Sequence, residues 1–355
     1  MSIQIQSNSP LRTVPDDYCA TGADRWFTVP SGHDAGKALF YSDYIPAGAA
    51  PEKTVLFVHG NPECSYTYRH ARQALQDSGV PLRIVCPDHI GFGISDQADF
   101  EMIDMHHAAN LRMLIEHLDL RHVILVIHDW GGPIGVGAFL DQMDRVDGLV
   151  VLNTTVFPMP KEGYTYDTWP LRAMPWSSLG WVIPRALWGG AAASVLEGAN
   201  PAPVAAIYAR SLIKQIRFAL RQIPENSAAY VFSESLRSKA NARSSQRNVR
   251  QTPVWGHGYA YTDKKHGRQD NHAFYRSMQE QLPQCWGEAG RNIPAAAHFG
   301  EFDPCGKPAV RDQWLAALPR LREDLHVYPD MGHFIEEYKG AEIAASIRAI
   351  AGAEA

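Results

Sequence analysis

The fold is decided by the stretch Val123-Ile-Leu-Val-Ile-His-Asp-Trp-Gly-Gly132. Its first five residues are apolar and mostly β-branched, which is typical of a central parallel strand covered on both faces. Two glycines end the stretch, and a helix-compatible run continues through Phe139. The sequence therefore predicts a buried strand, a sharp turn and a helix, with Asp129 at the turn.

A strand, a sharp turn and a helix in this order form the nucleophile elbow of the α/β-hydrolase fold. The central residue of an elbow is strained, and its neighbours must be small because the strand and helix backbones approach closely. Ser at this position gives acyl transfer, but here the residue is Asp129. A carboxylate can instead displace a leaving group from a saturated carbon and form an ester that water must hydrolyse. Asp is also a common helix N-cap, so this residue alone leaves a purely structural role open.

Length and composition set the broad class of the protein. A chain of 355 residues can form a large domain or a core with an insertion. Its net charge of -5 argues against binding to nucleic acid or to anionic membranes. The five cysteines are odd in number and form no C-x-x-C pair, so neither a disulfide framework nor a zinc site is expected. The chain shows no signal peptide and no membrane-spanning apolar run, and we expect it to be cytoplasmic.

Apolar runs alternate with helix-compatible segments, which predicts a mostly parallel, doubly wound sheet. The expected strands lie at residues 26–30, 38–44, 54–58, 82–86, 123–127, 148–152, 293–299 and 325–328. Between residues 157 and 285 no such run occurs, and prolines, tryptophans and tyrosines are frequent. We therefore predict a core formed by residues 1–156 and 286–355, with a helical cap at 157–285 that excludes water and shapes the pocket. An Arg-rich segment of the cap, 237–250, is expected to be a solvated face.

The loop His59-Gly-Asn-Pro62 follows the third expected strand. In α/β-hydrolases the loop at this place supplies one backbone N–H of the oxyanion hole, and the residue after the nucleophile supplies the other. These donors would be the backbone N–H groups of Asn61 and Trp130. Gly-Asn-Pro is also ordinary turn chemistry, so a plain turn is the alternative.

Two further residues complete a catalytic set. Asp303 directly follows the expected strand at 293–299, and His333 lies in the loop after the last strand. The order Asp129, Asp303, His333 is the nucleophile, acid and base order of α/β-hydrolases. Asp303 would fix the tautomer of His333 that leaves the other ring nitrogen free as a base. Asp330 is the alternative acid, although no strand ends directly before it.

Three motifs resemble the haloalkane dehalogenases: His59-Gly-Asn-Pro62, Asp88-x-x-Gly-x-Gly-x-Ser-Asp96 and His128-Asp-Trp-Gly-Gly132. The resemblance covers the core, from about residue 26 to 154 and from residue 293 onward. It implies that Asp129 is the nucleophile and His333 the base. It also implies that the Asn61 amide and the Trp130 indole N–H bind the departing halide. Two neutral donors aimed at a developing anion stabilise the transition state without binding the product too tightly.

The end of the sixth strand discriminates within that family. Some members take their catalytic acid from a Glu at this place, but here the strand ends in Leu152-Asn-Thr154. The resemblance therefore assigns the acid to Asp303. With Asn61 as the second halide donor, the pattern resembles the third subfamily, which is close to the β-lactone decarboxylases of long-chain olefin synthesis.

The expected reaction is hydrolytic dehalogenation through an alkyl ester on Asp129, which a His333-activated water hydrolyses. We expect no metal and no cofactor; the expected partners are a small apolar halogenated substrate, a halide ion and further copies in a homo-oligomer. β-Lactone decarboxylation is the first alternative, which a longer apolar pocket would favour.

Epoxide hydrolysis is the next alternative. That family shares the His-Asp-Trp-Gly elbow, and Glu63 suits it, but it normally has an aromatic residue in place of Asn61 and needs two cap tyrosines. The candidates are Tyr164, Tyr166, Tyr208, Tyr230, Tyr259 and Tyr261. A non-catalytic binding protein is disfavoured because the whole catalytic set is present.

Overall fold

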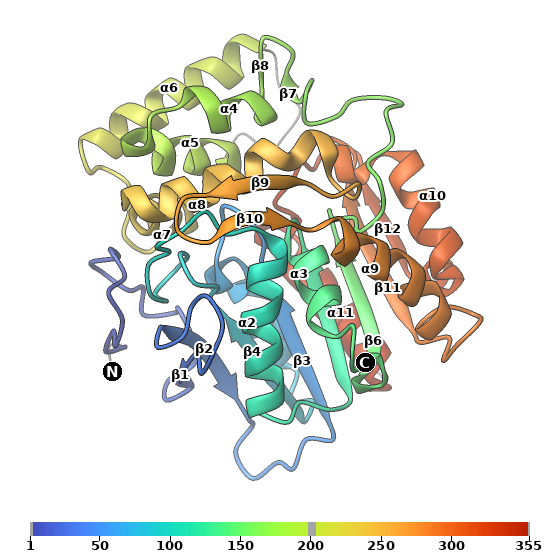
Figure 1. The fold of residues 1–355 in the computed structure, drawn as a ribbon. Coiled ribbons are helices and arrows are strands. Elements are labelled where there is room, and N and C mark those ends of the chain that lie inside the picture. Colours follow the sequence, from blue (N-terminus) through green and yellow to red (C-terminus); the bar gives the residue numbers. More distant parts are fainter. Residues whose placement is uncertain (1–2, 198–203, 354–355) are drawn as a thin grey trace.

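The computed structural model describes residues 3–197 and 204–353. Its centre is an eight-stranded sheet of order β1-β2-β4-β3-β5-β6-β11-β12 (Figure 1). The strands are β1 (Asp24–Thr28), β2 (Ala38–Tyr44), β3 (Lys53–Val58), β4 (Leu82–Pro87), β5 (Val123–His128), β6 (Val146–Leu152), β11 (Ala295–Gly300) and β12 (Leu325–Tyr328). The pairings from β4 to β12 are parallel, whereas β2 pairs antiparallel with both β1 and β4. The predicted fold class, a mostly parallel α/β-hydrolase sheet, is confirmed.

The strand β5 shows why a continuous apolar run belongs at the centre. Ile124 and Val126 pack toward one side of the sheet, with residues of α1 (Arg69–Asp77) and α11 (Gly340–Ala351). Val123, Leu125 and Ile127 pack toward the other side. Because successive side chains point to opposite faces, a strand buried on both faces must be apolar throughout.

The second side of the sheet is covered by the helices α2 (Asp104–His117), α3 (Gly131–Ala138), α9 (His272–Cys285) and α10 (Pro308–Ala317). Short 3-10 helices complete the connections: η1 (Ser65–Tyr68), η2 (Met143–Arg145), η3 (Thr252–Val254), η4 (Pro304–Gly306), η5 (Pro319–Glu323) and η6 (Ile335–Glu337). None of the helices in the described ranges is long and apolar enough to cross a bilayer.

The segment between β6 and α9 lies over the sheet as a mainly helical layer (Figure 1). Its helices are α4 (Trp176–Val182), α5 (Arg185–Glu197), α6 (Val204–Ala219), α7 (Ala228–Ser235) and α8 (Lys239–Gln251). It also contains two small antiparallel ribbons that the sequence did not predict, β7 (Pro170–Leu171) with β8 (Met174–Pro175) and β9 (Ala260–Asp263) with β10 (Gly267–Asp270). These ribbons are too short, and mostly too polar, to leave a strand signal.

The helix α8 corrects one expectation about this layer. The Arg-rich segment was expected to face solvent, but nine residues of α8 are buried. Arg247 pairs with Glu101 and lies over the Tyr261 ring, and Arg250 lies over the Trp181 ring. The arginines therefore tie α8 to its neighbours, because their guanidinium groups find acceptors and aromatic faces on the neighbouring segments.

Candidate active site

Asp129 lies at the turn between β5 and α3, and its backbone is strained as an elbow requires. Its φ of +49° is in the left-handed region, which a non-glycine residue rarely adopts. A Cβ on Gly60 would lie 2.3 Å from Oδ1 of Asp129, and a Cβ on Gly132 would lie 2.1 Å from Oγ1 of Thr154. Small residues are therefore required around the turn. No side-chain hydrogen bond caps α3, so Asp129 does not act as its N-cap.

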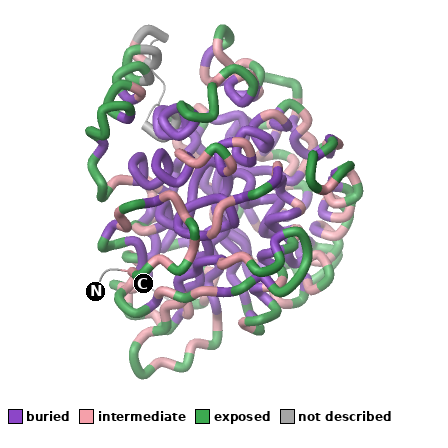
Figure 2. The backbone as a smooth tube through the Cα atoms, turned by 60° about the vertical axis from the view of Figure 1, so that its left-hand side comes forward, coloured by how far each residue is buried: buried purple, intermediate pink, exposed green. Residues whose placement is uncertain are grey.

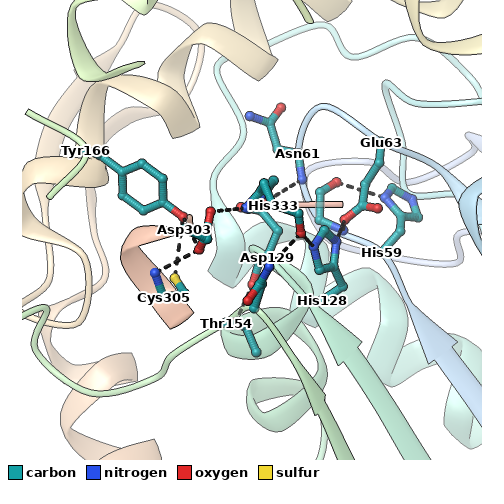
Figure 3. A network of polar contacts seen from close by, with 12 residues as sticks. His59, Asn61, Glu63, His128, Asp129, Thr154, Tyr166, Asp303, Cys305 and His333 are labelled. Atoms are coloured by element: carbon teal, nitrogen blue, oxygen red, sulfur yellow. Dashed lines mark hydrogen bonds and ion pairs between the residues drawn. The ribbon is translucent and has the colours of Figure 1, made fainter. Parts of the chain in front are cut away.

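The structure brings the three predicted catalytic side chains together (Figure 3). Nε2 of His333 lies 3.2 Å from Oδ2 of Asp129, and Nδ1 of His333 lies 2.7 Å from Oδ2 of Asp303. All three side chains are buried. The other oxygen of Asp303 accepts the backbone N–H of Cys305 at 2.8 Å. Asp330, the alternative acid, is exposed, so Asp303 is the carboxylate that meets the histidine.

Two carboxylates decide the charge state of His333. Burial opposes a charge on this imidazole, but Asp303 and Asp129 outweigh burial and raise the pKa of His333 well above its ordinary value. The free site therefore favours an imidazolium between two carboxylates. When one carboxylate becomes an ester, its negative charge is lost and the imidazole can release its proton more easily.

The backbone of Asn61 and its side chain face different partners. Its N–H donates to Oδ1 of Asp129 at 2.6 Å, as an oxyanion-hole donor should. For Trp130, the other predicted backbone donor, no bond to the Asp129 carboxylate is present within the described residues. The Asn61 amide points toward the cap (Figure 3). There its Oδ1 accepts from Oγ of Ser245 at 2.5 Å, its Nδ2 lies 3.3 Å from the Ser245 carbonyl oxygen, and Trp188 donates to the same Oγ.

The Trp130 indole is held by an aromatic stack. Its ring lies parallel to that of Trp255, with centroids 4.0 Å apart, and Trp255 stacks in turn on Tyr166 at 5.6 Å. Trp255 is fixed by a hydrogen bond from its indole N–H to the Thr155 carbonyl. Within the described ranges no protein acceptor bonds the Trp130 indole N–H, so this donor is available to an anion.

Sequence reasoning missed a buried network behind His333, the candidate catalytic base. His128 bonds Oε1 of Glu63 at 2.6 Å through Nδ1 and the carbonyl of His333 at 2.9 Å through Nε2. Glu336 lies 3.4 Å from the same Nε2. Burial opposes a charge on His128, but Glu336 and Glu63 raise its pKa to about 9. The only signal in the sequence was position, since His128 directly precedes Asp129.

Glu63, His128 and Glu336 form the one group in the described part of the chain whose atoms are close enough to hold a metal ion. Glu63 bonds one ring nitrogen of His128 and Glu336 lies near the other. Carboxylates at opposite ring nitrogens suit a shared proton better than chelation of one ion. The network therefore fits a role in holding the His333 loop.

Among the candidate cap tyrosines, Tyr166 lies beside the site, whereas Tyr259 and Tyr261 do not. The hydroxyl of Tyr166 lies 3.5 Å from Oδ1 of Asp303, and burial raises the pKa of Tyr166 well above its ordinary value. Tyr259 and Tyr261 instead contact Arg247, away from the nucleophile. The side chain of Tyr208 lies outside the described residues.

Comparisons with known proteins relate the chain to α/β-hydrolases. A family model described as the alpha/beta hydrolase fold matches residues 53–180. A cis-3-alkyl-4-alkyloxetan-2-one decarboxylase of Shewanella oneidensis is 28% identical over 313 residues, which cover 86% of this chain and 83% of that protein. A decarboxylase of the same name from Xanthomonas campestris is 34% identical over 142 residues, but the match spans only 43% of its length and 38% of this chain.

Haloalkane dehalogenases are matched as well. Haloalkane dehalogenase 2 of Mycobacterium bovis is 33% identical over 146 residues, covering 41% of this chain and 46% of that protein. The tetrameric haloalkane dehalogenase DpaA of Paraglaciecola agarilytica superposes with a TM-score of 0.62 at 22% identity, over 91% of this chain and 90% of that one. The chain thus has the α/β-hydrolase fold and is related both to haloalkane dehalogenases and to β-lactone decarboxylases.

Proposed function

We propose that the enzyme hydrolyses haloalkanes through a covalent ester on Asp129. The observation that carries this proposal is the unequal environment of the two Asp129 oxygens. Oδ1 accepts the N–H of Asn61, whereas Oδ2 lies 3.2 Å from Nε2 of His333. Oδ2 attacks the carbon, and the halide leaves toward the indole N–H of Trp130 and the amide of Asn61.

The second step uses the same atoms. Water activated by Nε2 of His333 attacks the carboxyl carbon of the ester, and negative charge then develops on Oδ1, where the Asn61 N–H already donates. Asp303 stabilises the imidazolium that forms. Tyr166 borders Asp303, and its hydrogen bond would keep that carboxylate oriented.

The test is halide release from a short bromoalkane, with Asp129→Ala as the control. We expect bromide release by the wild type and none by the variant. In His333→Gln the first step should proceed while hydrolysis stops, so the intact mass of the enzyme should increase by one alkyl group. A folded wild-type enzyme that neither releases bromide nor becomes alkylated would refute dehalogenation.

One observation favours β-lactone decarboxylation as a second candidate. The match to the Shewanella decarboxylase covers 86% of the chain, whereas the match to the mycobacterial dehalogenase covers 41%. Because the cap shapes the pocket, a relative matched over most of the chain is informative about the substrate. The same pair of proteins incubated with a cis-dialkyl β-lactone should then release carbon dioxide only with Asp129 intact.

The tetrameric state described for DpaA supports a homo-oligomer here as a further proposal. Light scattering of the protein as it elutes from a size-exclusion column measures the number of copies in the oligomer directly.

A further inference from the structure

The cap exposes an unusual number of large apolar side chains. Nine such side chains are exposed among the described residues, and seven of them belong to α4, α5, α6 or the residue after α6. These seven, which we name the cap-tip face, are Trp181, Val182, Leu187, Leu212, Ile213, Ile216 and Leu220. Exposed apolar residues that occur singly are normal, but a group of them marks a surface that contacts something.

The helix α6 orders this face into two strips. Leu212, Ile216 and Leu220 follow one another at intervals of four, so they share one side of the helix. They are 62%, 50% and 60% exposed. Arg210 and Arg217, seven residues apart, follow a neighbouring line and are exposed as well. In Figure 2 much of the outer cap is coloured as exposed. Phe218, on the opposite side of α6 from Leu212, Ile216 and Leu220, is buried.

The charge of this region is mostly of one sign. Residues 176–222 contain five basic residues and one acidic residue, Glu197. Arg185, Arg210, Arg217 and Arg221 are exposed there. A second copy of the chain docked face to face would bring these guanidinium groups together, and like charges across an interface oppose docking. A partner that is apolar inside and negative at its surface matches both strips.

We propose that the cap-tip face docks on an anionic lipid membrane. The leucine and isoleucine side chains enter the boundary between headgroups and acyl chains, and the arginines bind lipid phosphates. The helix lies in the plane of the surface and does not span it. This inference goes beyond the proposed reaction and does not depend on it.

Flotation of the full-length protein with lipid vesicles tests the proposal. The vesicles consist of phosphatidylcholine alone or of phosphatidylcholine with phosphatidylglycerol. We expect the protein to float with the anionic vesicles only, and the bound fraction to fall with added salt. Leu212→Gln/Ile216→Gln should abolish flotation, and Arg210→Gln/Arg217→Gln should reduce it at least several-fold.

The matched control is Ile45→Gln. Ile45 is 49% exposed, like the cap-tip residues, but it lies outside the cap, directly after β2. This variant should float as the wild type does. All substitutions are at exposed positions, and circular dichroism reports whether each variant is folded.

Three outcomes would overturn the proposal. The wild type fails to float with anionic vesicles, it floats equally with neutral ones, or the cap-tip variants float as well as the control. If the wild type does not bind vesicles and Leu212→Gln/Ile216→Gln converts an oligomer into monomers, the cap-tip face is instead a contact between copies of this chain.

Discussion

Ser245 controls the orientation of the Asn61 amide. The Trp188 indole N–H donates to Oγ of Ser245, so the hydroxyl proton goes to Oδ1 of Asn61. The opposite orientation of the amide would set its oxygen against the Ser245 carbonyl, which lies 3.3 Å from Nδ2. One N–H of the Asn61 side-chain amide therefore has no acceptor among the described residues, on the side away from Ser245.

We predict that Ser245→Ala weakens halide binding. Without the hydroxyl the amide can reverse, and the net loss of one hydrogen bond corresponds to about threefold to tenfold in a binding constant. The inhibition constant for bromide should rise by that factor. The matched control is Ser244→Ala in the same helix, since the Ser244 hydroxyl accepts from Met102 and not from Asn61. Equal effects of the two substitutions would mean that only the packing of α8 matters.

A second prediction concerns the pH dependence of hydrolysis. His333 must be neutral to activate water, so kcat falls as the pH drops through its pKa. In the ester intermediate Asp129 is uncharged, and Asp303 is then the main group that raises the pKa of His333. We expect Asp303→Asn to move the acid limb of kcat to lower pH and to reduce kcat by about 10²- to 10⁴-fold.

The measurement is kcat against pH for wild type, Asp303→Asn and Asp330→Asn. Asp330 is exposed, so its substitution should leave the limb in place. An acid limb that stays in place in Asp303→Asn would show that another group sets the protonation of His333.

At the scale of elements, α8 shows what could not be predicted from the sequence. The strands and the positions of the three candidate catalytic residues were predictable because each depends on a local signal, an apolar run followed by a turn. The contacts of α8 join residues far apart in the chain: Asn241 accepts the N–H of Ala98 at 3.0 Å, and Ser245 meets Asn61. Polar residues in a helix usually indicate solvent, and only the fold reveals that these have buried partners.

We predict that Asn241→Ala destabilises the protein through this element. The substitution leaves the buried Ala98 N–H and the Ser235 carbonyl without their partner. An unsatisfied buried polar group costs about 1–3 kcal/mol, so the free energy of unfolding in urea should fall by that amount. Lys239→Ala, at the exposed start of the same helix, is the control. A loss below about 0.5 kcal/mol would mean that water replaces the amide.

At the scale of the whole molecule, the net charge does not describe the charge of each surface. The value of -5 argued against contact with anionic membranes. That sum averages over the chain, whereas docking depends on the charge within about a Debye length of the contact. Residues 176–222, which include α4 to α6, hold five basic residues and one acidic residue, so this segment differs in sign from the molecule as a whole.

The last prediction joins the cap-tip face to the reaction and depends on both proposals. The cap that carries this face also reaches the site, since Ser245 bonds Asn61. A long-chain bromoalkane partitions into bilayers, whereas bromoethane stays largely in water. If docking brings the cap to dissolved substrate, anionic vesicles should raise the rate on the long-chain substrate and leave the rate on bromoethane unchanged. Leu212→Gln/Ile216→Gln should lose the rise and keep the rate on bromoethane, because both side chains are exposed whereas Asp129 is buried. A wild-type enzyme that floats with vesicles but slows on the long-chain substrate would show that docking closes the cap against the lipid phase.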